Sequence, residues 1–149
     1  MEIHTQMIPD TWSLTLDELT GIPIVTVHGE LTYADIRQFM SSIPDIPTYR
    51  DSSKRLWDLR HVAGLPTTNT VRSVAASVRS ETTTPRIAAF VVDQDVHFGL
   101  ARMFEMLSEQ PGVTRRVFRD YVEARHWLTQ PEATAEAAWG YTRYVGAFS

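Results

Sequence analysis

Short apolar segments alternate with amphipathic segments of helical period along most of this 149-residue chain. The clearest apolar segment, residues 86–92, is almost continuous, as is usual for a strand buried on both faces of a sheet. Residues 12–17 instead alternate between apolar and polar side chains, the period of a half-buried strand. Strands that alternate with helices indicate an α/β fold with a mostly parallel sheet and right-handed crossovers.

The first two predicted strands form a hairpin. They span residues 12–17 and 22–28, and the short link with Gly21 favours an antiparallel pair. Three further strands are expected at residues 54–60, 86–92 and 114–119. The sequence therefore predicts a five-stranded mixed sheet, mostly parallel, with an N-terminal antiparallel hairpin.

The first helix carries a clear start signal. Thr32 and Asp35 have the spacing of a capping box, and Leu31 and Ile36 have the spacing of a hydrophobic staple. The Pro-containing segment 41–53 is polar and is predicted to be a loop. The first helix should end where this segment begins.

Later helices are placed by apolar periodicity and by caps. One should begin near residues 66–69 and bury Val71, Val74, Ala75 and Val78. The next should be capped by Asp93 or Asp95 and bury Val96, Leu100, Met103, Phe104 and Leu107. A short helix is expected from Asp120 to near Leu128, and another between Pro131 and Gly140, before an aromatic tail at residues 141–149.

Composition narrows the class of protein. The length fits a single domain over residues 1–149, with a core at about 12–128 and a C-terminal helix and tail at 129–149. The chain has no cysteine, which excludes disulfides and thiolate ligands, and its net charge of −4 argues against nucleic-acid binding. It has no run of 18 apolar residues and no signal-peptide pattern, so we expect a cytoplasmic protein without an integral membrane segment.

The common catalytic and cofactor motifs are absent from the sequence. There is no G-x-G-x-x-G after the second strand, no P-loop, no H-E-x-x-H and no G-x-S-x-G. We therefore expect no catalytic residues and no cofactor, and a protein that acts by binding.

Four motifs resemble those of the SpoIIAA-like proteins of bacteria, also described as STAS/CRAL-TRIO-like domains. They are LWDLR at 56–60, RIAAFVVD at 86–93, FGLARMFEML at 98–107 and VFRDYVEARHWL at 117–128. The resemblance implies a β-α superhelix with a mixed sheet. It also implies a regulatory partner or, from the lipid-transfer relatives, an apolar ligand. The phosphorylation motif Asp-Ser-Ser/Thr-Gly of the anti-sigma-factor antagonists is missing from residues 61–70, so that switch is not expected.

One group of polar residues is a candidate site. The carboxyl ends of parallel strands line one edge of a sheet, where ligands commonly bind. This edge should gather His28, Asp58, Arg60, His61, Asp93 and His97. Arg60 with two helix N-termini could bind an anion, and the imidazoles with the carboxylates could bind a metal or serve an enzyme. Alternatively, Asp58 and Arg60 form a structural pair.

The expected placement of helices on the sheet bears on whether the protein associates with a second copy of itself. Right-handed crossovers would place the helices on one face, while the strands are apolar on both faces. The exposed second face would need cover from the C-terminal segment or from a second subunit. We therefore predict a homodimer with four aromatic residues in or beside its interface: Trp139, Tyr141, Tyr144 and Phe148.

Overall fold

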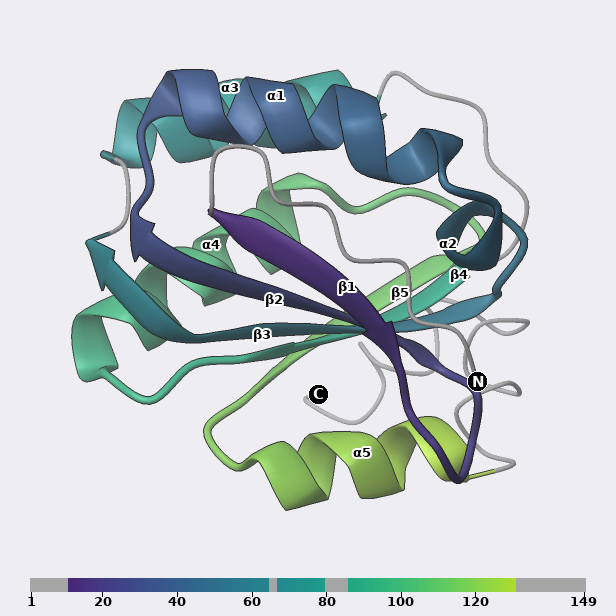
Figure 1. Cartoon of the computed structure of the whole chain (residues 1–149). Coiled ribbons are helices and arrows are strands. Elements are labelled where there is room, and N and C mark those ends of the chain that lie inside the picture. The colour runs from purple at the N-terminus through teal and green to yellow at the C-terminus, as the bar shows by residue number, and fades with distance from the viewer. Residues whose placement is uncertain (1–10, 65–66, 80–85, 131–149) are drawn as a thin grey trace.

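A five-stranded sheet organises the computed structural model, which describes residues 11–64, 67–79 and 86–130 (Figure 1). Its strands lie in sequence order: β1 (Trp12–Leu16), β2 (Pro23–Glu30), β3 (Lys54–Gly64), β4 (Arg86–Val91) and β5 (Val113–Phe118). β1 pairs with β2 in antiparallel fashion, and the other neighbouring pairs are parallel. The predicted mixed sheet with an N-terminal hairpin is confirmed.

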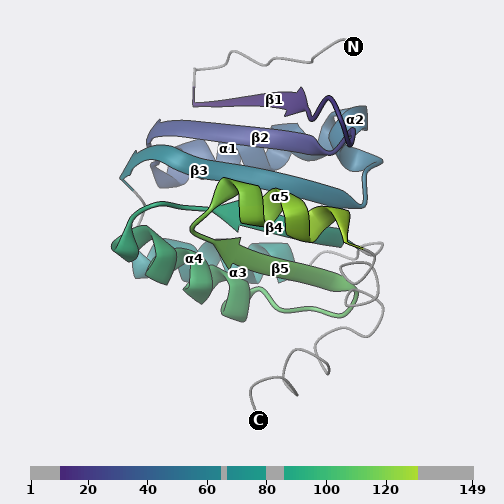
Figure 2. The ribbon, with the colours of Figure 1, turned by 90° about the horizontal axis from the view of Figure 1, so that it is seen from below.

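Helices lie on both faces of this sheet (Figures 1 and 2). They are α1 (Tyr33–Ser42), the 3-10 turn η1 (Ile43–Asp45), α2 (Pro47–Arg50), α3 (Thr68–Arg79), α4 (Asp95–Leu107) and α5 (Tyr121–Thr129). α1, α3 and α4 cover one face, called here the three-helix face. α5 covers the other, called the α5 face. The predicted helix at 131–140 and the aromatic tail lie outside the described residues.

The start of α1 is built as the sequence predicts. The Thr32 hydroxyl accepts a hydrogen bond from the Asp35 backbone N–H, and the Asp35 carboxylate accepts one from the Thr32 N–H, both at 3.1 Å. Leu31 and Ile36 are buried in the same apolar cluster on the three-helix face. The capping box and the staple thus fix where the chain leaves β2.

Residues 43–50 differ from the loop expected there. η1 and α2 fill this segment, and each has a proline in its first turn, Pro44 and Pro47. Proline is compatible with that position because the amide it lacks has no partner inside the helix. The buried Ile43 and Tyr49 attach both short elements to the core of the three-helix face.

α4 is rotated relative to the predicted core stripe. Val96 and Leu107 are exposed, whereas His97 and Glu105 are buried. Apolar residues occur nearly all round this helix, so their period alone does not define one inner face. The predicted cap is also wrong, because Gln94 is the N-cap residue and Asp95 is the first helical residue.

The α5 face is covered differently from the sequence expectation. Ala124 and Leu128 of α5 are fully buried against an apolar cluster from β3, β4 and β5. The expectation that only the C-terminal tail or a second subunit could cover this face is therefore wrong. The chain crosses to the opposite side of the sheet after β5, an edge strand that no later parallel strand follows.

Polar contacts hold α5 on the sheet. Lys54 at the start of β3 donates a hydrogen bond of 2.6 Å from Nζ to the Leu128 carbonyl. Arg125 is paired with Asp17, which follows β1 and also accepts from the backbone amides of Leu19 and Thr20. The same carboxylate therefore orders the β1–β2 turn and anchors α5.

We expect Asp17→Asn to make stability less sensitive to acid. The hydrogen bond from Arg125 lowers the pKa of Asp17 from 3.8 to about 2. A lowered pKa means that the ion pair stabilises the fold above about pH 4 and that this stabilisation is lost as the pH falls toward 2. Denaturant unfolding at pH 7 should show a loss of about 1–2 kcal/mol in the variant. The difference between the two proteins should narrow below pH 3; a constant difference would contradict this account.

Candidate functional site

Asp58 and Arg60 form an ion pair at the carboxyl edge of the sheet. Arg60 donates from Nε and Nη2 to the two carboxylate oxygens of Asp58, at 2.9 and 2.8 Å. Its guanidinium also lies over the ring of Tyr121 from α5, 4.6 Å from the ring centroid. Arg60 is thus engaged inside the molecule on the α5 face, which supports the structural reading of this pair.

The surroundings of Asp58 favour its ionised form. The side chain is buried, and burial alone raises the pKa of a carboxyl. Hydrogen bonds from the Arg60 side chain and backbone outweigh this effect and lower the pKa of Asp58 below its usual value. The pair therefore stays charged at neutral pH.

The other predicted edge residues are partly brought together, since the charge of His61 acts on Asp58 and the charge of Asp93 acts on Arg60. His28 lies opposite His61 in the β2–β3 register, and His61 Nε2 is 3.9 Å from an Asp58 oxygen. Asp93 is exposed, and His97 is buried in the first turn of α4, where its Nδ1 has no hydrogen-bond partner. Within residues 11–64, 67–79 and 86–130, no group of three or more acids and histidines could hold a metal ion.

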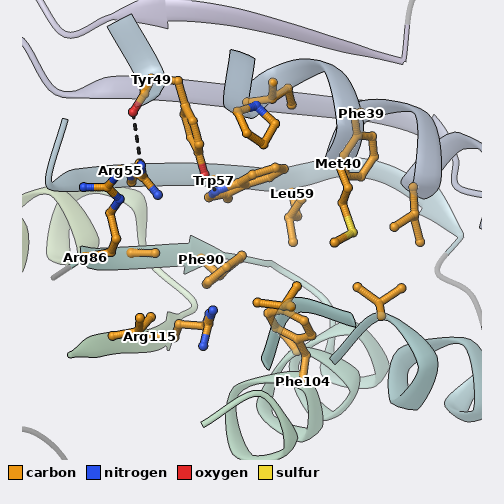
Figure 3. Close-up of a pocket in the computed structure, with 18 of the residues that line it drawn as sticks. Phe39, Met40, Tyr49, Arg55, Trp57, Leu59, Arg86, Phe90, Phe104 and Arg115 are labelled. Atoms are coloured by element: carbon orange, nitrogen blue, oxygen red, sulfur yellow. Dashed lines mark hydrogen bonds between the residues drawn. The ribbon is translucent and has the colours of Figure 1, made fainter. Parts of the chain in front are cut away.

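A large cavity lies between the sheet and the helices of the three-helix face (Figure 3). Its volume is about 530 Å3, within the range of about 300–1,000 Å3 usual for ligand pockets. Voids larger than a water molecule are few in packed interiors, so a space of this size is a candidate ligand site. Most of its lining is apolar: Leu31, Ile36, Phe39, Met40, Ile43, Pro44, Tyr49, Trp57, Leu59, Val71, Val74, Val78, Ala88, Phe90, Leu100, Ala101, Phe104 and Val113.

Aromatic rings form the floor of this cavity. Trp57 and Phe90 are paired in the β3–β4 register, and their rings stack with centroids 6.1 Å apart. Phe104 of α4 meets Phe90 edge-on at 5.9 Å, and Phe39 of α1 lies 5.7 Å from Trp57. These rings present a continuous apolar surface to whatever occupies the cavity.

Arginines gather toward one end of the cavity, away from Phe39 and Met40 (Figure 3). Arg55, Arg86 and Arg115 lie near the amino ends of β3, β4 and β5. Each donates hydrogen bonds to backbone carbonyls: Arg55 to those of Ser52 and Tyr49, Arg86 to that of Arg50, and Arg115 to that of Ser108. We call Arg55, Arg86 and Arg115 the arginine cluster.

The arginine cluster carries positive charge without a matching carboxylate. In the described part of the chain, none of its members forms an ion pair with Asp or Glu, whereas the fourth lining arginine, Arg50, pairs with Asp51. Burial, together with the charge of Arg55, lowers the pKa of Arg115 to about 10. Burial also lowers the pKa of Arg55, as does the charge of Arg86. Arg55 is therefore repelled by both of its neighbours in the cluster, Arg86 and Arg115.

Sequence reasoning identified neither the cavity nor the arginine cluster. A signal for the cluster is present, because three successive parallel strands each carry arginine near the start, at Arg55, Arg86 and Arg115. The amino ends of parallel strands meet at one edge, so this repetition places the arginines together. The cavity has no comparable signal, since it depends on how three helices rest on the sheet.

Comparison with known proteins supports the fold. No family model matches the sequence, and no curated protein matches it significantly. A solved structure of a DUF3478-family protein from Shewanella loihica PV-4, which has a SpoIIAA-like fold, superposes with a TM-score of 0.51. The two chains are 16% identical, and the match covers 78% of this chain and 91% of the other. The fold is therefore SpoIIAA-like, as the sequence motifs implied. In the described ranges, no helix is long and apolar enough to cross a membrane.

We expect Arg60→Lys to destabilise the fold. Lysine keeps the charge but cannot make the two parallel hydrogen bonds to the buried Asp58, so the unfolding free energy should fall by about 1–2 kcal/mol. Arg119→Lys is the control, because Arg119 pairs with the exposed Asp95 and such pairs contribute less than about 1 kcal/mol. Equal denaturation midpoints for the two variants would contradict a structural role for the Asp58–Arg60 pair.

Proposed function

We propose that this chain is a non-enzymatic binding domain whose cavity takes a small, largely apolar molecule. The observation that carries the proposal is the cavity of about 530 Å3 beneath α1, α3 and α4, with its aromatic floor. Transfer of apolar surface from water is favourable by about 25 cal/mol per Å2, so an apolar ligand gains most where it touches the rings. An elongated aliphatic chain suits the row of side chains from Trp57 to Phe104.

The lining favours binding over catalysis. Among its described residues it contains no carboxylate and no imidazole, and the hydroxyl of Tyr49 accepts a hydrogen bond of 3.3 Å from Trp57 Nε1. General acid–base catalysis needs a titratable group within reach of the reacting atom. Asp58, His61 and the other predicted edge residues are not part of this lining.

A paired set of alanine substitutions tests cavity binding. Ala101 of α4 lines the cavity, whereas Ala76 of α3 is exposed and is not among the lining residues. We expect dodecan-1-ol to bind the wild-type protein in calorimetry, Ala101→Phe to weaken its binding at least tenfold by filling the space, and Ala76→Phe to leave it unchanged. Absence of binding to the wild-type protein, or equal effects of the two variants, would refute the proposal.

We also propose self-association as a homodimer, on a different observation. Val96, Met103 and Leu107 share one side of α4, Val96 is 63% exposed, and the neighbouring Met106 is 64% exposed. Exposed apolar stripes of this kind commonly mark protein interfaces. Trp139, Tyr141, Tyr144 and Phe148 lie outside the described residues, so their place in an interface stays a prediction.

We expect full-length protein to sediment as a dimer at micromolar concentration and Val96→Glu to shift it toward monomer. Glutamate is tolerated in the first turn of a helix, so the fold should persist. Leu19→Glu is the control, because Leu19 is exposed in the β1–β2 turn, far along the chain from α4. A wild-type protein that is monomeric at high micromolar concentration would exclude the dimer. If deletion of residues 131–149 left association unchanged, the tail would have no part in it.

A further inference from the structure

The strand register places the arginine cluster at one end of the cavity. Ala88 of β4 lies opposite both Arg55 of β3 and Arg115 of β5. Residues 86, 88 and 90 alternate with the buried residues of the α5 face, so Arg86 and Ala88 point to the same side as Phe90. Ala88, which has no side-chain atoms beyond Cβ, lines the cavity between the two arginines.

The charge of this cluster is partly desolvated and uncompensated. The hydrogen bonds of the three arginines go to carbonyl or amide oxygens, Arg55 also lies over the ring of Tyr49, and no carboxylate of the described residues pairs with them. Burying like charges without a counter-ion is unfavourable, and an anion bound among them would remove that cost. By contrast, Arg60 is paired with the buried carboxylate of Asp58.

We propose that Arg55, Arg86 and Arg115 bind the acidic head group, carboxylate or phosphate, of an amphiphile whose apolar chain occupies the cavity. This inference rests on the proposed function and specifies its ligand class. The guanidinium groups supply forked donors that match the oxygens of either head group. The chain then runs from the space above Ala88 across Trp57 and Phe90 toward Phe104.

A simpler ligand, either purely apolar or a small anion, would suit only one end of the cavity. A purely apolar molecule would leave the arginine cluster uncompensated, and a small inorganic anion would leave the aromatic floor uncovered. Arg115 joins both ends, since its guanidinium lies 5.6 Å from the ring centroid of Phe104. A single ligand that is anionic at one end and apolar along the rest satisfies both.

Calorimetry with three dodecyl compounds and inorganic phosphate tests the inference. The compounds are dodecanoate, dodecyl phosphate and dodecan-1-ol, measured on wild type, Arg115→Gln and Arg116→Gln. Arg116 is the matched control because it is the next residue of β5, points to the α5 face and lies near Phe118 and Trp127. The readout is the ratio of acid to alcohol affinity within each protein, which cancels any general loosening of the cavity.

For the wild-type protein we expect at least one acid to bind about 10- to 100-fold tighter than the alcohol, as charge-assisted hydrogen bonds predict. Arg115→Gln should bring this ratio close to one, and Arg116→Gln should preserve it. Which acid is preferred distinguishes a carboxylate from a phosphate head group. Arg115→Lys, which keeps a charge and loses the fork, should give an intermediate ratio if Arg115→Gln fails to fold.

Several results would overturn the inference. Equal affinity of the alcohol and the acids for the wild-type protein would reject the head-group site but would leave the proposal of apolar binding standing. An unchanged ratio in Arg115→Gln, or inorganic phosphate binding as tightly as dodecyl phosphate, would also reject it. Failure of all three dodecyl compounds to bind would reject the proposed function together with the inference.

Discussion

The alternation of side chains along β3 and β4 divides the molecule into two unlike halves. Trp57 and Phe90 point to the three-helix face, while Leu56 and Ala89 point to the α5 face. Both faces are apolar, so each needs a cover. On the α5 face one short helix packs directly on small and branched side chains. On the opposite face three helices rest on large aromatic rings and leave the cavity, so the shape of the cavity follows from the pleat of the sheet.

Charge is distributed along the same sheet in two ways. At the carboxyl ends of the strands Arg60 forms an ion pair with Asp58, and Arg125 of α5 forms one with Asp17. The charges of these two arginines are therefore compensated inside the molecule. At the amino ends Arg55, Arg86 and Arg115 have no carboxylate among the described residues. Paired charges of the first kind position elements of the fold. Unpaired charges beside an apolar cavity are suited to recognising a ligand.

Local signals in the sequence predicted much of the fold. The capping box at Thr32 and Asp35, the hairpin at Gly21 and the apolar segment 86–92 each depend on neighbouring residues, so they can be recognised without tertiary structure. The inner face of α4 could not be predicted, because apolar side chains surround that helix and packing against α3 and β5 selects the buried side. The place of α5 likewise depends on long-range contacts, including the pair between Asp17 and Arg125.

The sequence directed attention to the carboxyl edge of the sheet for a general reason. Ligands of parallel α/β folds commonly bind at the carboxyl edge, and the polar residues there looked like a site. In the structure two of these residues, Asp58 and Arg60, form hydrogen bonds with each other. The arginines that remain uncompensated are spread over three strands and gather only when β3, β4 and β5 pair in register.

The location of a bound aliphatic chain is the most direct test of this account. Proton NMR of methyl-labelled protein with dodecanoate measures contacts between the chain and individual side chains. The account predicts nuclear Overhauser effects from the chain to methyl groups that line the cavity, those of Leu59, Val74 and Leu100, and none to the exposed methyl groups of Leu19 and Val122. Contacts confined to the exposed residues, or the absence of any contact at saturating ligand, would contradict a binding function for the cavity.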